Sequence, residues 1–539
     1  MAGVSAAFAA EGQYRPIPFE EAEKLYPQTL DARDFGAAAD DGKDDAEALR
    51  AAVAAAAKMT AKGGVRIVLG KGSYDILTYE KGVGVPVRNL SKIMIDGRGA
   101  AIISHKERAP FASLDSEDIT FANLKFKAAE LPFAGAKVVA VGNGYLDCEV
   151  VPPHVIREVS PKAIIGFDRA NDAIIWTRTD FYQKKSSLLV KKLSEAVMRV
   201  PLEDYLKKRT EAMPKVGDDV VVRYRVYDPP AIILEGGRNA RVYNADILTH
   251  AGMGIHGRNT ENILICNLRV SPQTKDLWMS STADATHFNT CRGCIDILDS
   301  VFEKMGDDAV NVHQMYWIVS EKISPKVLKV IYGKTVDGHY LPVEILPRIG
   351  ETVAFGEPNN PMNLSASAKV AKVEPDTKNK TALIALESDA PAWVAAGTPV
   401  ANLSADPKLT IKNCKVRGNR ARGFLVKVSE ASIEDCEFER TTGAGILLEN
   451  DVNFWYEGIR VNNLTVKNCK FKACDAPGIR GDKIEVISDS AKDSKGKPLT
   501  DFVNKTVTVE NCSFEQCGEN PISLPYTANP ILKNNSIKN

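Results

Sequence analysis

The C-terminal third of the chain repeats one short pattern four times, and this repeat limits the folds that the chain can adopt. Each copy has alternating apolar residues, an Asn-Cys or Asp-Cys pair, a second apolar pair and a polar turn. The four cysteines are Cys414, Cys436, Cys469 and Cys512, so the spacing is first 22 residues and then 33 and 43. A period in the low twenties with several period-2 strands is typical of a parallel β-helix, in which each copy forms one coil. A propeller needs about 40 residues and four strands per repeat, so it does not fit.

The N-terminal region and two interruptions of the repeat complete the predicted architecture. The sequence "DDAEALRAAVAAAA", followed by strand patterns, predicts a helix that caps the open end of the solenoid, as in pectate-lyase-type β-helices, which the start resembles. We predict an all-β fold, a right-handed parallel β-helix with this capping helix and two inserted small β-barrel-like modules. In the first module, residues 186–208 read as helical. The predicted segments are 1–126 (cap and first coils), 127–229 (first module), 230–314 (coils with the candidate site), 315–404 (second module) and 405–539 (last coils).

Composition excludes two classes of function. Lys and Arg total 69, and Asp and Glu also total 69. The chain therefore lacks the basic field on which most nucleic-acid-binding proteins rely, and no nucleic-acid partner is expected. No apolar run approaches the roughly 20 residues of a membrane span. The Ala-rich start "MAGVSAAFAAEGQ" fits the remainder of a removed export signal, which predicts a periplasmic or secreted protein.

The ten cysteines predict a row of buried thiols, not a disulfide framework. Several of them fall at one position of the repeat, and a chain of this length does not need disulfides to stabilise its core. "CRGC" (residues 291–294) has a spacing found in metal sites, but no second Cys or His pair stands near it. A zinc site is therefore not expected.

Three aspartates stand in two short motifs at the spacing of one coil. Asp284 in "TADATHF" precedes Asp307 in "GDDAVNVH" by 23 positions, and Asp308 adjoins it. One coil rises about 4.8 Å, so the three carboxylates are predicted to converge on one surface. Strict alternation would separate Asp307 from Asp308, and we expect Gly306 to permit a bend that turns both outward. Mutual repulsion would raise at least one pKa, which provides the proton donor and the base of glycoside hydrolysis.

Five motifs, in this order along the chain, resemble glycoside hydrolase family 110, the exo-acting α-1,3-galactosidases of bacteria. They are "HAGMGIHGRNTENILICNLRV", "TADATHF", "GDDAVNVH", "NRARGFLVK" and "DVNFWYEG". The resemblance implies removal of terminal α-1,3-linked galactose from blood-group B-type, linear α-galactosyl or galactan glycans, with inversion. It further implies that Asp284, Asp307 and Asp308 are the catalytic carboxylates, and it requires no metal or other cofactor. Which carboxyl protonates the leaving oxygen and which activates water stays open.

Other residues are candidates for binding the sugar. An Arg in a carboxylate-rich pocket can orient hydroxyls and hold an Asp ionised, and a Trp can stack on the apolar face of galactose. Glu344 is also a second candidate for the acid. The candidate substrate-binding residues are Trp278, His287, Asn311, His313, Glu344, Arg420, Arg422, Asp451 and Trp455. Glu457 is a plausible further hydroxyl ligand, although surface exposure is the simpler explanation for it.

Three rival functions share the same predicted fold. A polygalacturonase-like hydrolase of family 28 has a similar set of three aspartates, but its Gly-His-Gly and Arg-Ile-Lys motifs are not found here. A polysaccharide lyase commonly uses Ca²⁺ or a basic residue to neutralise the uronate and a Lys, Arg or Tyr as base, and neither "TADATHF" nor "GDDAVNVH" contains a Lys, Arg or Tyr. A non-catalytic glycan-binding solenoid would not need three converging carboxylates.

The sides of the predicted solenoid and its inserted modules also leave surface for a homodimer.

Overall fold

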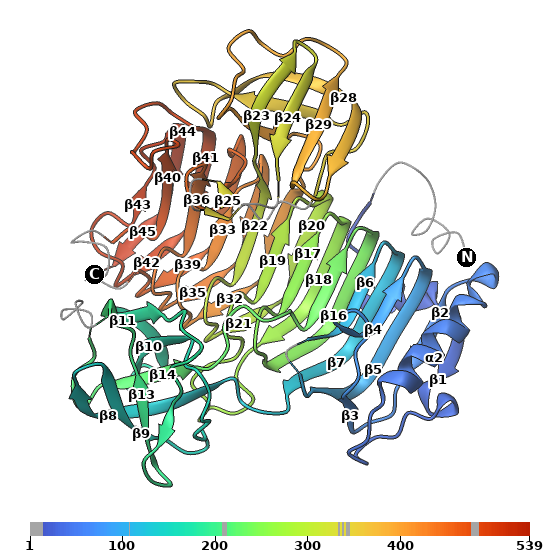
Figure 1. Ribbon diagram of the computed structural model, residues 1–539, viewed down its shortest axis with the longest axis vertical. Coiled ribbons are helices and arrows are strands. Elements are labelled where there is room, and N and C mark those ends of the chain that lie inside the picture. The colour runs from blue at the N-terminus through green and yellow to red at the C-terminus, as the bar shows by residue number, and fades with distance from the viewer. Residues whose placement is uncertain are drawn as a thin grey trace.

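Parallel strands stacked into a solenoid form the body of the molecule (Figure 1). The computed structural model describes residues 14–106, 108–206, 213–332, 335–336, 339–340, 345–475 and 484–538. One sheet of 11 strands carries the candidate site. Its strands are β4 (Val83–Arg88), β6 (Ala109–Leu114), β15 (Ile232–Glu235), β17 (Ile255–Arg258), β19 (Thr286–Asn289), β22 (Val310–Met315), β33 (Phe424–Val426), β36 (Ile446–Asp451), β40 (Ile487–Lys492), β43 (Ile522–Ser523) and the short β37 (Glu457–Gly458).

The remaining walls of the solenoid belong to a connected sheet of 19 strands. These are β1 (Gln28–Asp31), β2 (Val65–Val68), β3 (Ser73–Ile76), β5 (Ser91–Ser104), β7 (Glu117–Ala128), β16 (Arg238–Thr249), β18 (Glu261–Val270), β20 (Arg292–Leu298), β21 (Val301–Glu303), β31 (Lys408–Lys412), β32 (Lys415–Arg417), β34 (Glu430–Glu434), β35 (Glu437–Glu439), β38 (Asn463–Lys467), β39 (Lys470–Lys472), β41 (Asn504–Glu510), β42 (Ser513–Glu515), β44 (Thr527–Lys533) and β45 (Ser536–Lys538). The predicted parallel β-helix is confirmed.

The Asn-Cys and Asp-Cys pairs of the repeat make the bends between these strands. Asn413 and Asp435 adopt left-handed φ angles of 53° and 56°, which Asn and Asp tolerate better than most residues. The cysteine that follows each of them, Cys414 or Cys436, is buried in the core. All ten cysteines lie within the described residues and all are free thiols, so the predicted row of buried thiols is confirmed.

Rows of like side chains connect successive coils. Asn267 donates to the side chain of Asn244 at 2.8 Å, and Asn244 donates to that of Asn123 at 2.9 Å. In the core the ring of Phe471 stacks on Phe438 and on Phe514, with centroids 4.7 and 5.0 Å apart. These contacts hold each coil in register with the next.

A short helical region covers the N-terminal end of the solenoid (Figure 1). It comprises α1 (Phe19–Ala22), α2 (Ala46–Ala57) and 3₁₀ turns at Glu23–Leu25, Ala32–Phe35 and Thr60–Lys62. The buried face of α2 includes Leu49 and Val53, which join the core of the first coils. The capping helix is therefore present as predicted. No helix among the described residues is long and apolar enough to cross a bilayer.

The first insert is a seven-stranded antiparallel sheet between β7 and β15. Its order is β11 (Ala173–Tyr182), β10 (Ala163–Asp168), β14 (Asp219–Arg223), β8 (Phe133–Gly142), β9 (Tyr145–Val150), β13 (Val197–Pro201) and β12 (Lys191–Lys192). The helix predicted over 186–208 is wrong, because the described part of that segment contains β12 and β13. Met198 and Val200 alternate into the core of the insert while β13 pairs with β9.

The second insert is a closed barrel that follows β22 directly (Figure 1). Around the barrel the strands are β23 (Trp317–Ser324), β24 (Val327–Ile331), β29 (Thr381–Leu386), β28 (Leu364–Asp376), β27 (Thr352–Gly356) and β30 (Pro399–Asn402). A two-stranded ribbon, β25 (Thr335–Val336) and β26 (His339–Tyr340), belongs to the same stretch. Arg292 of the solenoid binds Glu351 of the barrel through two nitrogens, at 2.6 and 3.0 Å. We propose that the chain divides into the five segments predicted from the sequence, with borders after residues 126, 229, 314 and 404.

Candidate active site

The candidate site lies at the N-terminal ends of three neighbouring strands of the 11-stranded sheet. Asp284 precedes β19, Asp307 and Asp308 precede β22, and Arg422 precedes β33. These strands pair in parallel, β19 with β22 and β22 with β33. Thr286 pairs with Val310, so one coil here is 24 residues and not 23. Asp308, and not Asp307, therefore occupies the position that corresponds to Asp284.

The structure brings the three aspartates together, and we call Asp284, Asp307 and Asp308 the aspartate cluster. One carboxylate oxygen from each lies within 4.8 Å of the others, and all three residues are buried. Adjacent residues of a regular strand would point to opposite faces. The predicted bend is present at Gly306 and Asp307, and both carboxylates reach the cluster. Gly306 does so without a left-handed φ, and a Cβ on it would lie 2.3 Å from the carbonyl oxygen of Thr282. Glycine is required here by close backbone packing between the two coils.

Asp307 is surrounded by hydrogen-bond donors. Arg420 donates to its Oδ1 at 2.7 Å, and the hydroxyl of Tyr227 donates to its Oδ2 at 2.8 Å. Burial opposes ionisation, but Arg420, Arg422 and the Tyr227 hydroxyl together lower the pKa of Asp307 below its usual value. Asp307 is therefore the ionised member of the cluster.

Asp308 is in the opposite electrostatic situation. Burial raises its pKa to about 8, and the nearby charges of Asp307 and Asp284 act in the same direction, while Arg422 acts against them. The backbone N–H of Arg422 donates to Oδ1 at 2.9 Å and its guanidinium donates to Oδ2 at 2.8 Å. Burial also raises the pKa of Asp284. The cluster thus holds a proton on the side of Asp284 and Asp308 and a negative charge on Asp307.

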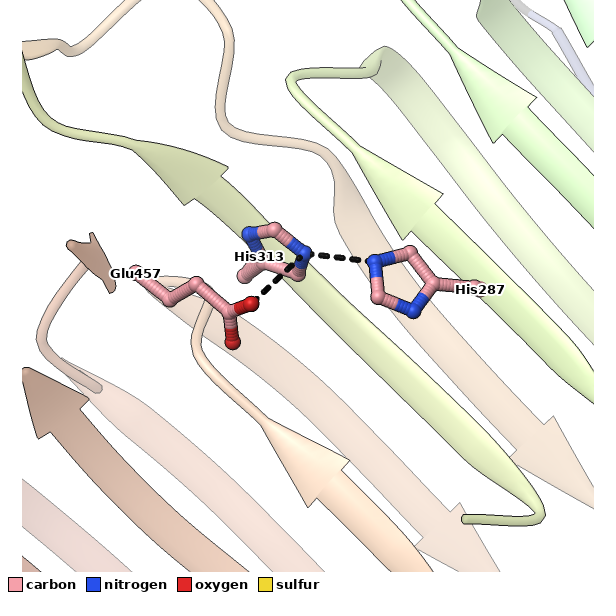
Figure 2. A group of neighbouring side chains, drawn as sticks. All are labelled: His287, His313 and Glu457. Atoms are coloured by element: carbon pink, nitrogen blue, oxygen red, sulfur yellow. Dashed lines mark hydrogen bonds and ion pairs between the residues drawn. The ribbon is translucent and has the colours of Figure 1, made fainter. Parts of the chain in front are cut away.

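A chain of ionisable groups continues from Asp284 through His287 and His313 to Glu457, and Figure 2 shows the last three of these. His313 is buried, and His287 and Glu457 are half-buried. His287 contacts Asp284 through Nδ1 at 2.6 Å, and its Nε2 lies 2.8 Å from Nε2 of His313. Although burial opposes protonation, the bond to Asp284 raises the pKa of His287; burial lowers the pKa of His313 to about 3. His287 therefore carries protons on both nitrogens and donates to Asp284 and to the neutral His313.

The far end of this chain is an ion pair. Glu457 lies 3.6 Å from Nε2 of His313 and accepts a hydrogen bond from Lys427 at 2.5 Å. Although burial opposes ionisation, nearby cations lower the pKa of Glu457; since His313 is neutral, this effect comes from the Lys427 ammonium and from His287. The carboxylate and the ammonium compensate each other inside the protein, and they fix the position of His313 beside His287.

Two groups among the described residues could supply three ligands to a metal ion, namely the aspartate cluster and the set His287, His313 and Glu457. In both groups, protein cations already bind the carboxylates: Arg420 and Arg422 in the first and Lys427 in the second. The positive charge that a metal would contribute is thus supplied by side chains.

Several other predicted residues fall beside the cluster. His287, His313, Arg420 and Arg422 do so through the contacts described above. Asn311 pairs with His287 across β22 and β19, and its buried Oδ1 has no hydrogen-bond partner in the described part of the chain. Such an unpaired buried acceptor is costly unless a ligand satisfies it.

The remaining predicted residues have other positions. Trp278 is only 5% exposed, and Phe167, whose ring is parallel at a centroid distance of 4.5 Å, covers it, so the predicted sugar-stacking role is wrong. Asp451 accepts backbone hydrogen bonds from Asn453 and Trp455, so its carboxylate holds a turn. That turn presents Trp455 at 56% exposure, two residues before Glu457. Glu344 lies outside the described residues.

Glu457, a plausible hydroxyl ligand from the sequence, lies at the end of the chain of ionisable groups and is not a surface residue. Three residues of the site were not predicted. Lys427 stands in the motif "NRARGFLVK", so the motif itself could have identified it. Asp180 and Tyr227 come from the first insert and reach the cluster through Arg420 and Asp307. No motif marks these two; the only signal for Tyr227 is its place just before the coils resume at β15.

The chain is similar to several known proteins. A family described as "Right handed beta helix region" matches residues 400–539. Alpha-1,3-galactosidase B of Bacteroides thetaiotaomicron is 26% identical over 75% of this chain and 67% of its own length. Alpha-1,3-galactosidase B of Akkermansia muciniphila is 24% identical over 94% of this chain and 69% of its own length. The solved exopolygalacturonase of Thermotoga maritima is similar with a TM-score of 0.39 and 13% identity, covering 95% of each chain. The resemblance to family 110 is thus confirmed, and the chain is a glycoside hydrolase related to the bacterial α-1,3-galactosidases.

Proposed function

We propose that this glycoside hydrolase removes terminal α-1,3-linked galactose from glycans, with the aspartate cluster as its catalytic centre. The observation that supports this most strongly is the pair of adjacent carboxyls with opposite pKa shifts. Asp307 is held ionised by Arg420 and Tyr227, and Asp308 is held protonated by burial and by the neighbouring carboxylates. Hydrolysis of a glycoside needs both states in one site at neutral pH.

Each member of the cluster has its own role in the proposal. Asp308 protonates the leaving glycosidic oxygen, because its pKa of about 8 keeps the proton available at neutral pH. Asp307 activates the attacking water as a base. Asp284 raises the pKa of Asp308 and is itself held in place by His287.

The proposal includes inversion at the anomeric carbon, which the family resemblance implies. The nearest oxygens of the cluster lie within 4.8 Å, closer than the roughly 6.5–9.5 Å usual between the two carboxyls of inverting glycosidases. The anomeric form of the first product therefore has to be measured directly. We also propose a periplasmic or secreted location, since polymeric glycans are met outside the cell.

The decisive experiment is proton NMR of the products from α-1,3-galactobiose, the branched B trisaccharide and polygalacturonate, each in EDTA. We expect β-galactose to appear first from at least one of the galactosides, and the preferred galactoside defines the substrate. α-Galactose as the first product would contradict inversion. Cleavage of polygalacturonate without cleavage of the galactosides would replace the proposal by a polygalacturonase-like activity.

A further inference from the structure

Tyr227 combines an exposed ring with a hydroxyl that touches the aspartate cluster. The residue is 56% exposed, yet its hydroxyl donates to Asp307 at 2.8 Å. The desolvated surroundings of the hydroxyl and the charge of Asp307 raise the pKa of Tyr227 well above its usual value, so the group stays a donor at neutral pH. An aromatic surface is thus open to solvent beside the ionised carboxylate.

Contacts on both sides of the site hold this ring in place. Tyr182 lies parallel to it, with centroids 6.3 Å apart and an interplanar angle of 4°. The guanidinium of Arg223 lies 5.0 Å from the centroid of Tyr182, which gives that ring a rigid support. On the solenoid side, the hydroxyl of Thr282 donates to the carbonyl of Val226 at 2.9 Å, which ties the backbone next to Tyr227 to the coil of Asp284.

The site has a deep polar end and an exposed aromatic rim. Asn311 Oδ1 and Arg422 Nε are buried and lack hydrogen-bond partners among the described residues. Buried polar atoms of this kind bind hydroxyl groups of a ligand, whereas an exposed ring offers apolar contact. An enzyme that removes a terminal sugar places that sugar at the deep end and the rest of the glycan at the rim.

We propose that Tyr227, supported by Tyr182, forms the subsite for the sugar to which the terminal galactose is attached. This inference rests on the proposed function and adds to it the residue that recognises the leaving sugar. A pyranose presents C–H bonds on one face, and this face stacks on an aromatic ring. The first insert therefore contributes substrate selectivity to a catalytic centre that the solenoid provides.

The test compares Tyr227→Phe with Tyr227→Leu on two substrates. Both variants lose the hydroxyl bond to Asp307 equally, and only the phenylalanine keeps an aromatic face. On α-1,3-galactobiose we expect kcat/KM of the leucine variant to be about three- to tenfold below that of the phenylalanine variant. On α-galactosyl fluoride, which has no leaving sugar, we expect the two variants to agree within about twofold.

Other outcomes separate this inference from the proposed function. An equal difference between the variants on both substrates, or no difference on the disaccharide, would overturn the subsite while the function stands. A wild-type protein that is inactive on both substrates would overturn both. Tyr145→Leu is the matched control, because Tyr145 lies on β9 of the same insert with its ring against Arg199. It should follow the wild type on both substrates.

Discussion

At the scale of single residues, the site depends on treating two adjacent carboxyls differently. Asp307 meets Arg420 and Tyr227, whereas Asp308 lies deeper, beside Asp284, and its one cation, Arg422, does not offset its burial. One backbone step therefore separates a base from an acid. If Asp308 is the acid, replacing it should slow hydrolysis most for substrates whose leaving group needs a proton.

Asp308→Asn is expected to lower kcat on α-1,3-galactobiose by about 10²–10⁴-fold, because the leaving sugar is no longer protonated. The same variant should keep most of its activity on α-galactosyl fluoride, since fluoride leaves without a proton. Asp307→Asn should lose activity on both substrates, because the attacking water is no longer activated. Initial rates on the two substrates measure this, and the reverse pattern would exchange the two roles.

The same two residues set the expected pH dependence. Asp308 is active while protonated, so kcat/KM should fall as the pH rises through about 8, the pKa to which burial raises it. Asp307 is active while ionised, and its lowered pKa places the acidic limb below the usual titration range of Asp. A profile of kcat/KM from pH 3 to 10 on α-1,3-galactobiose should show a broad plateau. A basic limb that falls near pH 6 would contradict this assignment of the proton.

At the scale of strands and turns, the sequence pattern predicts those features that depend only on the residues within one coil. The repeat predicted the solenoid, because Asn413 and Asp435 carry the bend and the cysteine after each of them carries the burial in every copy. By the same reasoning, the spacing of the three aspartates predicted that their carboxylates lie close together. The spacing could not predict that the coil is 24 residues long. This length depends on the packing of Gly306 against Thr282, and neither residue belongs to the repeat pattern.

Contacts between the inserts and the solenoid could not be predicted in the same way. The segment predicted as helix in the first insert contains good helix formers, but it pairs as β13 with β9, and Met198 and Val200 of β13 are buried in the core of the insert. Trp278 is a residue type that often stacks on sugars, but Phe167 of the first insert covers its ring. Tyr227 reaches Asp307 only because that insert docks where it does.

Gly306→Ala tests the packing between the coils that carry the cluster. The new Cβ would lie 2.3 Å from the carbonyl oxygen of Thr282, so β22 would have to move away from β19. We expect a loss of stability of about 1–3 kcal/mol and a lower kcat, because Asp307 moves with the backbone. Thermal unfolding and initial rates check both effects. Gly70→Ala is the control, since its Cβ would meet only the hydroxyl of Tyr74, at 3.3 Å.

At the scale of the whole molecule, the site is assembled from segments far apart in the chain. Arg420 follows the second insert, Asp180 belongs to the first, and Asp307 lies between the two inserts. Arg420 binds Asp180 through Nε at 3.0 Å and Asp307 through a terminal nitrogen at 2.7 Å. Arg223, which is fully buried, joins the first insert to the same coils by donating to the carbonyls of Thr282 and Gly306. Electrostatic control of the base is therefore shared between the solenoid and the insert.

A double-mutant cycle on Arg420 and Asp180 measures this coupling. Arg420→Met removes a cation that holds Asp307 ionised and leaves Asp180 nearby with Arg223, at 3.7 Å, as its remaining ion-pair partner. The pKa of Asp307 should then rise by about 1–3 units, which moves the acidic limb of kcat/KM to higher pH.

Asp180→Asn alone should move this limb to lower pH or leave it in place, since Arg420 then acts on Asp307 without compensation. The shift that Asp180→Asn causes in the Arg420→Met background should differ from the shift that it causes in the wild type, because Arg420 bridges Asp180 and Asp307, so the two single shifts should not add in the double variant. Arg417→Met, which removes a half-buried cation paired with Glu439 and Asp172, is the control for the loss of a positive charge elsewhere on the solenoid. Strictly additive shifts would mean that Asp180 acts on Asp307 independently of Arg420, and the absence of any shift from Asp180→Asn in either background would mean that this insert residue does not act on the base.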